Sequence, residues 1–463
     1  MLVMKFGGTS VGSAERFLAV AKIIEQSPDP ALVVVVSAMS GTTSALIAGG
    51  RAAAEGQRER YRSIKEELLA KHLTTVEALL PAGSERAALT DYIVGQLEDY
   101  ERLCASIATL GEFTMRGNDA VASIGEELSS RILAALLRAR GRRAHAVSAT
   151  TCVRTDDQFG GATPDMGTTR QLVQERVRPL VAEGIVPIVT GYIGATAKGI
   201  TTTLGRGGSD YSAAILGACL DADEVWIWTD VNGILTADPK LVPEARTLSV
   251  LSYAEAEELA YFGADVLHPK TVAPLAERGI PLRILNSFAP EHPGTLIVTT
   301  PDPSRPIMPA IISTDGLSWI GVAGNGREWS LHMASRALKC LAEAGVEVLM
   351  FSQSFTERSL NLVVRCGDQA HSIRVLQREF ADDLRLGHLS AIGVQEEVAT
   401  VSVVGMPDAG GAPIAPRAFA ALGKLGLRVI SVGQAASAYS VSFVIAEKDL
   451  PRAVPFIHRE LGL

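Results

Sequence analysis

The chain has 463 residues, which is too long for one ordinary hydrophobic core and predicts two or three domains. Apolar residues make up 47% and charged residues 20%, the balance of a globular protein. The net charge of −8 argues against nucleic acid as the main partner but allows a nucleotide, which needs positive charge only locally. The opening apolar run ends at Lys5, and no run reaches the length of a membrane span. The cysteines show no C-x-x-C spacing, so the sequence indicates a reducing, cytoplasmic location.

A glycine loop follows the first predicted strand. The apolar run at 2–4 leads into Lys5, the glycine pair at 7–8, two hydroxyl residues and a helix at about 13–24. Glycines let the backbone approach a ligand, and loop amides together with a lysine favour phosphate. The pattern is neither a P-loop nor a dinucleotide fingerprint, and a plain glycine turn is the alternative. A second glycine loop at 205–210 favours the phosphate site.

Three further segments are candidates for ligand binding. The β-branched run at 31–36 is followed by a hydroxyl-rich loop at 37–43, where open α/β sheets bind ligands, although helix capping is the simpler interpretation. Glu126 opens a predicted helix, where it either favours the helix dipole or binds an ammonium group. Arg206 lies between glycines and offers a bidentate fork to a carboxylate or phosphate, while Asp210 either caps the next helix or organises the loop.

The remaining elements of the first 300 residues predict an α/β domain. Strands at 144–148, 185–190, 224–229 and 282–285 alternate with helical segments, as parallel sheets require. The charge-dense segment 52–110 predicts two or three long helices, either a lid or a packing subdomain. No paired-ligand spacing surrounds His268, so we interpret it as structural and predict no dedicated metal site.

The last third of the chain is a duplication behind a linker. Four prolines between 301 and 309 mark the linker, which we assign to residues 301–311. Beyond it, a shift of 81 residues relates Arg336 to Arg417, and each copy reads helix, glycine, strand, Gln-loop, strand. Such α+β repeats indicate duplicated domains. They form either a pair of small-ligand clefts or a purely structural dimerisation unit.

These motifs together resemble aspartate kinase, across essentially the whole chain and in the same order. The motifs are Lys5-Phe6-Gly7-Gly8-Thr9-Ser10, Gly205-Arg206-Gly207-Gly208-Ser209-Asp210, Trp228-Thr229-Asp230-Val231-Asn232-Gly233, Thr236-Ala237-Asp238-Pro239 and Phe262-Gly263-Ala264 with Leu267-His268-Pro269. The resemblance implies an amino-acid kinase αβα sandwich on a mainly parallel sheet at 1–300. Two α+β ACT (ferredoxin-like) domains are then expected at 312–392 and 393–463. We expect no dehydrogenase domain within these residues.

The resemblance implies transfer of the ATP γ-phosphoryl to the side-chain carboxylate of L-aspartate, which gives 4-phospho-L-aspartate, the first step of lysine, threonine and methionine biosynthesis. ATP with Mg²⁺ is the expected phosphoryl donor. The implied catalytic residues are Lys5, Gly8 and Asp210. The implied substrate-binding residues are Thr43, Glu126, Phe159, Arg206 and Ser209. The implied nucleotide-binding residues are Lys5, Phe6, Gly7, Gly8, Thr229, Asp230, Leu235, Lys240 and Asp265.

Two of these nucleotide positions depart from the family pattern. Leu235 stands where many members carry tyrosine, and Asp265 stands where several carry lysine. Losing a positive charge near the phosphates weakens ATP binding unless another group compensates, and Lys270 is the candidate.

The repeat region is expected to bind a regulatory amino acid. By resemblance, lysine or threonine inhibits there, through Gln353, Ser354, Glu357, Ser359 and Gln434, and the two modules bind unequally. A homo-oligomer through the ACT modules is expected. The competing hypotheses are a sister kinase with another carboxylate acceptor and a non-catalytic amino-acid sensor.

Overall fold

The computed structural model describes residues 1–27, 29–261, 269–301, 308–325, 331–354, 358–405, 414–434 and 440–463. The chain forms two compact units. Unit 1 contains Met1–Ile234, Thr247–Glu257 and Asp265–Pro301, and unit 2 contains Leu235–Arg246, Glu258–Ala264 and Asp302–Leu463. Two short segments that precede residue 300 therefore belong to unit 2.

Unit 1 is built on an eight-stranded sheet with the strand order β3-β4-β2-β1-β7-β9-β10-β8. All neighbouring strands are parallel except β9 and β10, so the predicted mainly parallel α/β fold is confirmed. The central strands are continuous apolar runs because helices cover both faces. The strands are β1 (Leu2–Phe6), β2 (Leu32–Val36), β3 (Ala144–Val147), β4 (Val186–Thr190), β7 (Glu224–Thr229), β8 (Val250–Ser252), β9 (Leu282–Asn286) and β10 (Thr295–Val298). A separate hairpin pairs β5 (Ile193–Ala195) with β6 (Thr201–Thr203).

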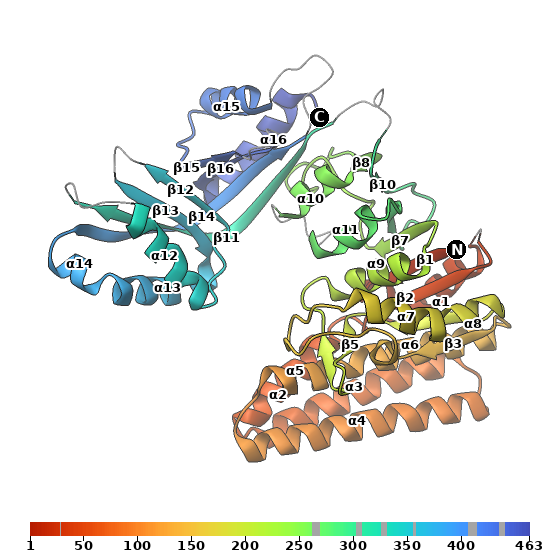
Figure 1. The fold of residues 1–463 in the computed structure, drawn as a ribbon. Helices are drawn as coiled ribbons and strands as arrows, with labels where there is room; N and C mark the ends of the chain where they lie inside the picture. Colours follow the sequence, from red (N-terminus) through yellow and green to blue (C-terminus); the bar gives the residue numbers. More distant parts are fainter. Residues whose placement is uncertain are drawn as a thin grey trace. The chain divides into compact units, whose positions relative to one another are not determined.

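Helices form a layer on each face of this sheet (Figure 1). Helix α6 packs on β2, β3 and β4 together with α1, whereas α9 packs on β1, β2 and β7 together with α7 and α11. These helices are α1 (Ala14–Glu25), α6 (Ile124–Ala139), α7 (Met166–Arg176), α9 (Gly208–Leu220) and α11 (Pro269–Ala276). Unit 1 also contains α5 (Met115–Ala122) and α8 (Arg178–Ala182), and α10 (Tyr253–Tyr261) runs from unit 1 into unit 2.

The segment predicted to be helical at 52–110 forms long helices that share the main core. They are α2 (Thr42–Ala54), α3 (Arg58–Leu79) and α4 (Ser84–Leu110), and α3 and α4 lie side by side in Figure 1. Their buried side chains join one hydrophobic cluster with β1, β2, α1 and α6. Helix α2 approaches α4 so closely that a Cβ on Gly49 would lie 1.7 Å from the Tyr100 hydroxyl. The helices are therefore a packed layer of unit 1.

Unit 2 contains one six-stranded antiparallel sheet with the order β12-β13-β11-β14-β16-β15. Its strands are β11 (Ala310–Gly324), β12 (Met350–Ser354), β13 (Ser359–Arg365), β14 (Leu389–Val404), β15 (Ser431–Gln434) and β16 (Ser440–Ala446). Its helices are α12 (Leu331–Glu343), α13 (Cys366–Glu379), α14 (Ala381–Arg385), α15 (Ile414–Leu425) and α16 (Leu450–Leu461). The long strands β11 and β14 pair along their length, so both copies of the repeat share this sheet.

Each copy has its own core in unit 2. The first packs α12 and α13 against β11 and β13, and the second packs α15 and α16 against β14 and β16. Ala237 and Val242, from the segment between β7 and β8, join the second core. Thr236 fixes this segment because its carbonyl accepts from Ile311 N–H (2.8 Å) and its hydroxyl lies 3.0 Å from His458 Nε2.

None of the described helices combines the length and apolar content needed to cross a membrane.

Candidate functional site

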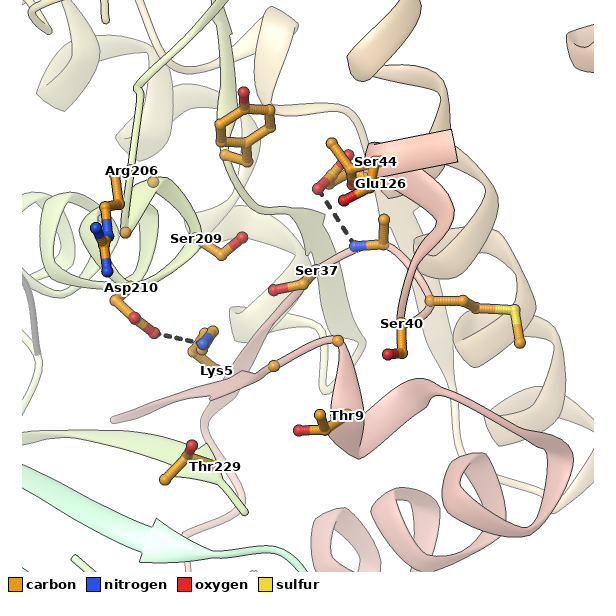
Figure 2. Close-up of a pocket in the computed structure, with 18 of the residues that line it drawn as sticks. Lys5, Thr9, Ser37, Ser40, Ser44, Glu126, Arg206, Ser209, Asp210 and Thr229 are labelled. Carbon is orange, nitrogen blue, oxygen red and sulfur yellow. Dashed lines mark hydrogen bonds and ion pairs between the residues drawn. The ribbon is translucent and has the colours of Figure 1, made fainter. Parts of the chain in front are cut away.

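A cavity of about 550 Å³ opens in unit 1 where β1, β2 and β7 reach their carboxyl ends (Figure 2). In a doubly wound sheet this edge is where ligands bind, because the loops after parallel strands gather there. The lining comes from the loops after β1 and β2, the first turns of α2, α6 and α9, and the end of β7. The lining residues are 5, 7–9, 37–41, 43–44, 126, 192, 205–210, 227 and 229.

The loop after β1 is shaped by close backbone packing. Gly7 N–H donates to the Trp228 carbonyl (3.2 Å), and the Gly8 carbonyl accepts from Ser40 N–H (3.1 Å). A Cβ on Gly8 would lie 3.0 Å from the Ala38 carbonyl oxygen, which is tighter than side chains normally tolerate. The glycine therefore lets the loops after β1 and β2 meet, and it leaves the loop backbone as part of the cavity wall.

Lys5 is the fixed positive charge of the cavity. Side chains alternate along β1, so Phe6 faces the core with α1 and α6, while Lys5 faces α9. There Lys5 Nζ forms an ion pair with Asp210 Oδ1 at 2.5 Å, marked in Figure 2. Lys5 is only 8% exposed. Because the pair is largely shielded from water, the ammonium is held in one position.

The amino ends of two helices also point into the cavity. Helix α2 begins after Gly41 (φ 77°) and α9 begins after Gly207 (φ 69°), and both glycines take the left-handed conformation. A glycine supplies no side-chain cap, and first-turn residues of both helices line the cavity. Uncapped first-turn amides and the helix dipole favour anions. Together with Lys5, they make this a site for phosphate or carboxylate groups.

Glu126 contributes a buried carboxyl group to the cavity. Its carboxyl is 3% exposed; Oε1 accepts a hydrogen bond from Ala38 N–H (3.3 Å), and Oε2 is buried without a partner among the described residues. Burial raises the pKa of Glu126 to about 8, because the Ala38 N–H bond offsets the loss of hydration only in part. A buried acceptor that lines a cavity and lacks a donor is suited to an ammonium group of a ligand.

Nine of the sequence-predicted residues lie together in this cavity. They are Lys5, Gly7, Gly8, Thr43, Glu126, Arg206, Ser209, Asp210 and Thr229. Figure 2 shows Arg206 and Glu126 entering from different walls, the first from the loop before α9 and the second from α6. The arrangement places a guanidinium and a carboxylate around one space, which fits a zwitterionic ligand.

The cavity also contains polar residues that sequence reasoning did not single out as site residues. They are Thr9, Ser37, Ser40, Ser44 and Tyr192. The serines lie in or beside the hydroxyl-rich loop, so the pattern gave a signal for them. Tyr192 follows β4 and has a left-handed backbone conformation (φ 67°). No local sequence pattern predicts that this residue belongs to the site. Burial raises the pKa of Tyr192, and the nearby charges of Glu126 and Asp119 raise it further.

Other predicted residues do not line the cavity. Phe6 is fully buried and stacks on Trp228, with ring centroids 5.9 Å apart. Phe159 is half-buried in the loop before α7, and Asp230 is exposed directly after β7.

Two of the remaining nucleotide assignments fall in unit 2. Leu235 and Lys240 belong to the segment that joins unit 2. Asp265 lies outside the described residues, and Lys270 is exposed at the start of α11. Among the residues that the structure describes, no cluster of three or more His, Cys, Asp or Glu side chains is placed to hold a metal ion.

The predicted regulatory residues lie on strands of unit 2. Gln353 and Ser354 end β12, Ser359 begins β13 and Gln434 ends β15. Glu357 lies outside the described residues. Gln353 Nε2 and Ser359 Oγ are buried without hydrogen-bond partners in the described part of the chain. Strands β12 and β15 also meet, because the hydroxyl oxygens of Ser352 and Ser431 are 2.8 Å apart.

Comparison with known proteins identifies the family. The model of the amino acid kinase family matches residues 1–286, and an ACT domain model matches residues 401–461. Chloroplastic aspartokinase 1 of Arabidopsis thaliana is 33% identical over 470 residues, covering 99% of this chain and 79% of the relative. Chloroplastic bifunctional aspartokinase/homoserine dehydrogenase 2 of the same plant is 33% identical over 474 residues and 100% of this chain. The chain spans 50% of the length of that bifunctional relative.

Solved structures agree over the full length. The crystal structure of E. coli aspartokinase III in complex with aspartate and ADP (R-state) has a TM-score of 0.84 and 28% identity, with 100% of both chains covered. The complex of the same enzyme with lysine and aspartate (T-state) has a TM-score of 0.80 and 30% identity, with 100% of this chain and 99% of that chain covered. The fold is that of an amino acid kinase with ACT modules. The chain belongs to the aspartokinase branch of the amino acid kinase family.

Proposed function

We propose that this protein is an aspartate kinase, which transfers the γ-phosphoryl group of ATP to the side-chain carboxylate of L-aspartate. One observation supports this most strongly. A single cavity combines a fixed lysine and two helix amino ends, which suit phosphates, with Arg206 and the unpartnered oxygen of Glu126, which suit an amino acid. The aspartate and ADP bound by the E. coli relative have this chemistry.

The charged residues of the cavity have different roles in this proposal. Arg206 binds the α-carboxylate of the amino acid, and Glu126 accepts from its ammonium group, so the side-chain carboxylate is left facing Lys5. That carboxylate is ionised at neutral pH and attacks phosphorus without a general base. Lys5 and the loop amides stabilise the charge on the transferring group, and Asp210 holds Lys5 in place.

The cavity also fits the phosphates of ATP. Its amide-rich walls and Lys5 supply donors and positive charge, and Thr229 contributes a hydroxyl at the end of β7. Asp230, directly after β7, adds to the nucleotide site in this proposal, and the assignments of Leu235, Lys240 and Asp265 stay predictions of the resemblance. Mg²⁺ would accompany ATP, held largely by phosphates and water, and would supply positive charge for the transfer.

We further propose that unit 2 binds a regulatory amino acid, lysine or threonine. Gln353 Nε2 and Ser359 Oγ support this, because within the described residues both are buried without hydrogen-bond partners, and such groups are costly unless a ligand pairs with them. The E. coli relative has been solved with lysine. Assembly of two or more copies through the ACT modules belongs to the same proposal.

Hydroxylamine trapping tests the proposed reaction. The protein is incubated with ATP, Mg²⁺ and hydroxylamine plus L-aspartate, L-glutamate or no acceptor, with and without lysine or threonine. We expect aspartyl hydroxamate only with L-aspartate, about 10³-fold slower formation with Lys5→Met, and less product in the presence of one effector. Product with another acid and none with aspartate would identify a sister kinase. No product with any acid would contradict the kinase proposal.

A further inference from the structure

A buried carboxylate outside the cavity lining has no role in the reaction described above. Asp119 lies on α5, one helix before Glu126, and is fully buried (0% exposed). Its Oδ2 accepts from the backbone N–H groups of Gly160 and Thr203, both at 2.9 Å, and its Oδ1 accepts from the Thr203 hydroxyl at 2.8 Å. All three partners donate, which suits an acceptor-only carboxylate.

The three hydrogen bonds join segments that are far apart in the sequence. Gly160 follows Phe159 in the loop before α7, and this loop is closed at its base because Asp156 Oδ1 accepts from Thr163 N–H (3.0 Å). Thr203 ends β6, and its carbonyl accepts from Ala162 N–H (2.8 Å). Asp119 thus attaches one loop and one strand end to α5.

The segment after Thr203 leads into the cavity wall, and the loop that carries Gly160 contacts that segment. Two residues after Thr203 comes Gly205, in the left-handed conformation (φ 78°), and then Arg206. A Cβ on Gly205 would lie 3.3 Å from the Gly160 carbonyl oxygen, so the two loops are in backbone contact. The position of Arg206 therefore depends on the loop that Asp119 holds.

We propose that Asp119 is a positioning residue that holds the loops carrying Phe159 and Arg206 together, so that the amino-acid half of the cavity is formed before substrate arrives. This inference rests on the proposed function for its kinetic consequence. A preformed site avoids the entropy cost of ordering two loops on binding, so loss of Asp119 weakens amino-acid binding more than nucleotide binding.

The variants separate positioning from folding. Asp119→Asn retains acceptors for both backbone N–H groups through its amide oxygen, and its amide nitrogen donates to the Thr203 hydroxyl. It should therefore fold even where Asp119→Ala does not. Asp165→Asn is the matched control. Asp165 also accepts from two backbone N–H groups, of Gly167 and Thr168, and from the Thr168 hydroxyl, but it caps α7 at the far end of the same loop.

Two readouts are needed. For Asp119→Ala we expect KM for the amino acid to rise at least tenfold, while the dissociation constant for ATP changes less than twofold. Asp119→Asn should give a smaller rise, and Asp165→Asn none. Amide hydrogen exchange of the ligand-free protein should be faster at 156–163 and 203–206 in both Asp119 variants.

Equal effects on amino acid and ATP, equal effects of the Asp119 and Asp165 variants, or unchanged exchange would each overturn the proposal. Hydrogen exchange needs no turnover. If the wild-type protein makes no acyl phosphate from any acid, the proposed function fails, and exchange still decides whether Asp119 holds the loops.

Discussion

The buried carboxyl of Glu126 should make amino-acid binding depend on pH. Its pKa in the ligand-free protein is about 8, chiefly because burial removes hydration from the charged form. In the proposed function, a ligand ammonium group binds the ionised carboxylate through Oε2, which has no partner among the described residues. Near neutral pH, Glu126 must therefore lose its proton before the ammonium group binds. The free energy of this deprotonation weakens the observed binding.

The magnitude follows from the pKa. One pH unit below it, roughly one tenth of the protein has Glu126 ionised, and one unit costs about 1.4 kcal/mol. KM for the amino acid should therefore fall about tenfold as the pH rises from 7 to above 8, and it should then level off. KM for ATP should stay level over the same range, because Glu126 binds no phosphate.

Steady-state kinetics between pH 6 and 9 measure this dependence, and Glu126→Gln is the comparison. Glutamine keeps an acceptor for Ala38 N–H but carries no charge. The variant should have a high amino-acid KM that does not change with pH. A wild-type KM that stays level from pH 6 to 9, or a variant that retains the wild-type slope, would refute the reasoning.

Three other predictions concern single side chains. Lys5→Met should lower kcat by a factor of about 10³ with little change in amino-acid KM, because Lys5 acts on charge that develops during transfer. An unchanged rate constant in single-turnover assays would count against this role of Lys5. Lys71→Met should raise amino-acid KM severalfold at unchanged melting temperature, because Lys71 Nζ donates to the Ser40 carbonyl (2.5 Å) in the cavity wall. A change in the KM for ATP alone would contradict this prediction. Burial lowers the pKa of His72 to about 4, so the stability present above pH 6.5 should decline by about 3 kcal/mol as the pH falls to 4. Urea unfolding of wild type and His72→Leu measures this, and equal pH slopes would be inconsistent with it.

The sequence predicted site residues best where they lie in the loops that connect strands and helices of the parallel sheet. A lysine at the end of β1 and a glycine loop before α9 come from distant parts of the chain, yet parallel strands deliver both loops to one edge of the sheet. The resemblance assigned Glu126 to the same site, and the structure places it in the same cavity. The resemblance to aspartate kinase implied the fold class, and the apolar strands and helices predicted along the chain agree with it.

Contacts between residues far apart in the sequence could not be predicted from the sequence pattern. Nothing local distinguishes Lys71 from other lysines of a charge-dense helix, and its role depends on α3 packing beside the loop after β2. Asp119 resembles any acidic residue at a helix until the bonds to Gly160 and Thr203 are visible. The segment after β7 has only scattered apolar residues, so its membership of the unit 2 core was not predictable from periodicity.

Oxygen transfer tests the central claim most directly. L-Aspartate labelled with ¹⁸O in its side-chain carboxyl is incubated with ATP, Mg²⁺ and hydroxylamine, and the released phosphate is examined by ³¹P NMR. Attack of the carboxylate oxygen on phosphorus, followed by hydroxylamine attack on the acyl carbon, leaves the bridging oxygen on phosphate. We predict one ¹⁸O in each phosphate released with the wild-type protein, and release of such phosphate about 10³-fold slower with Lys5→Met. Release of unlabelled phosphate alone would mean that water, not the aspartate carboxylate, accepts the phosphoryl group.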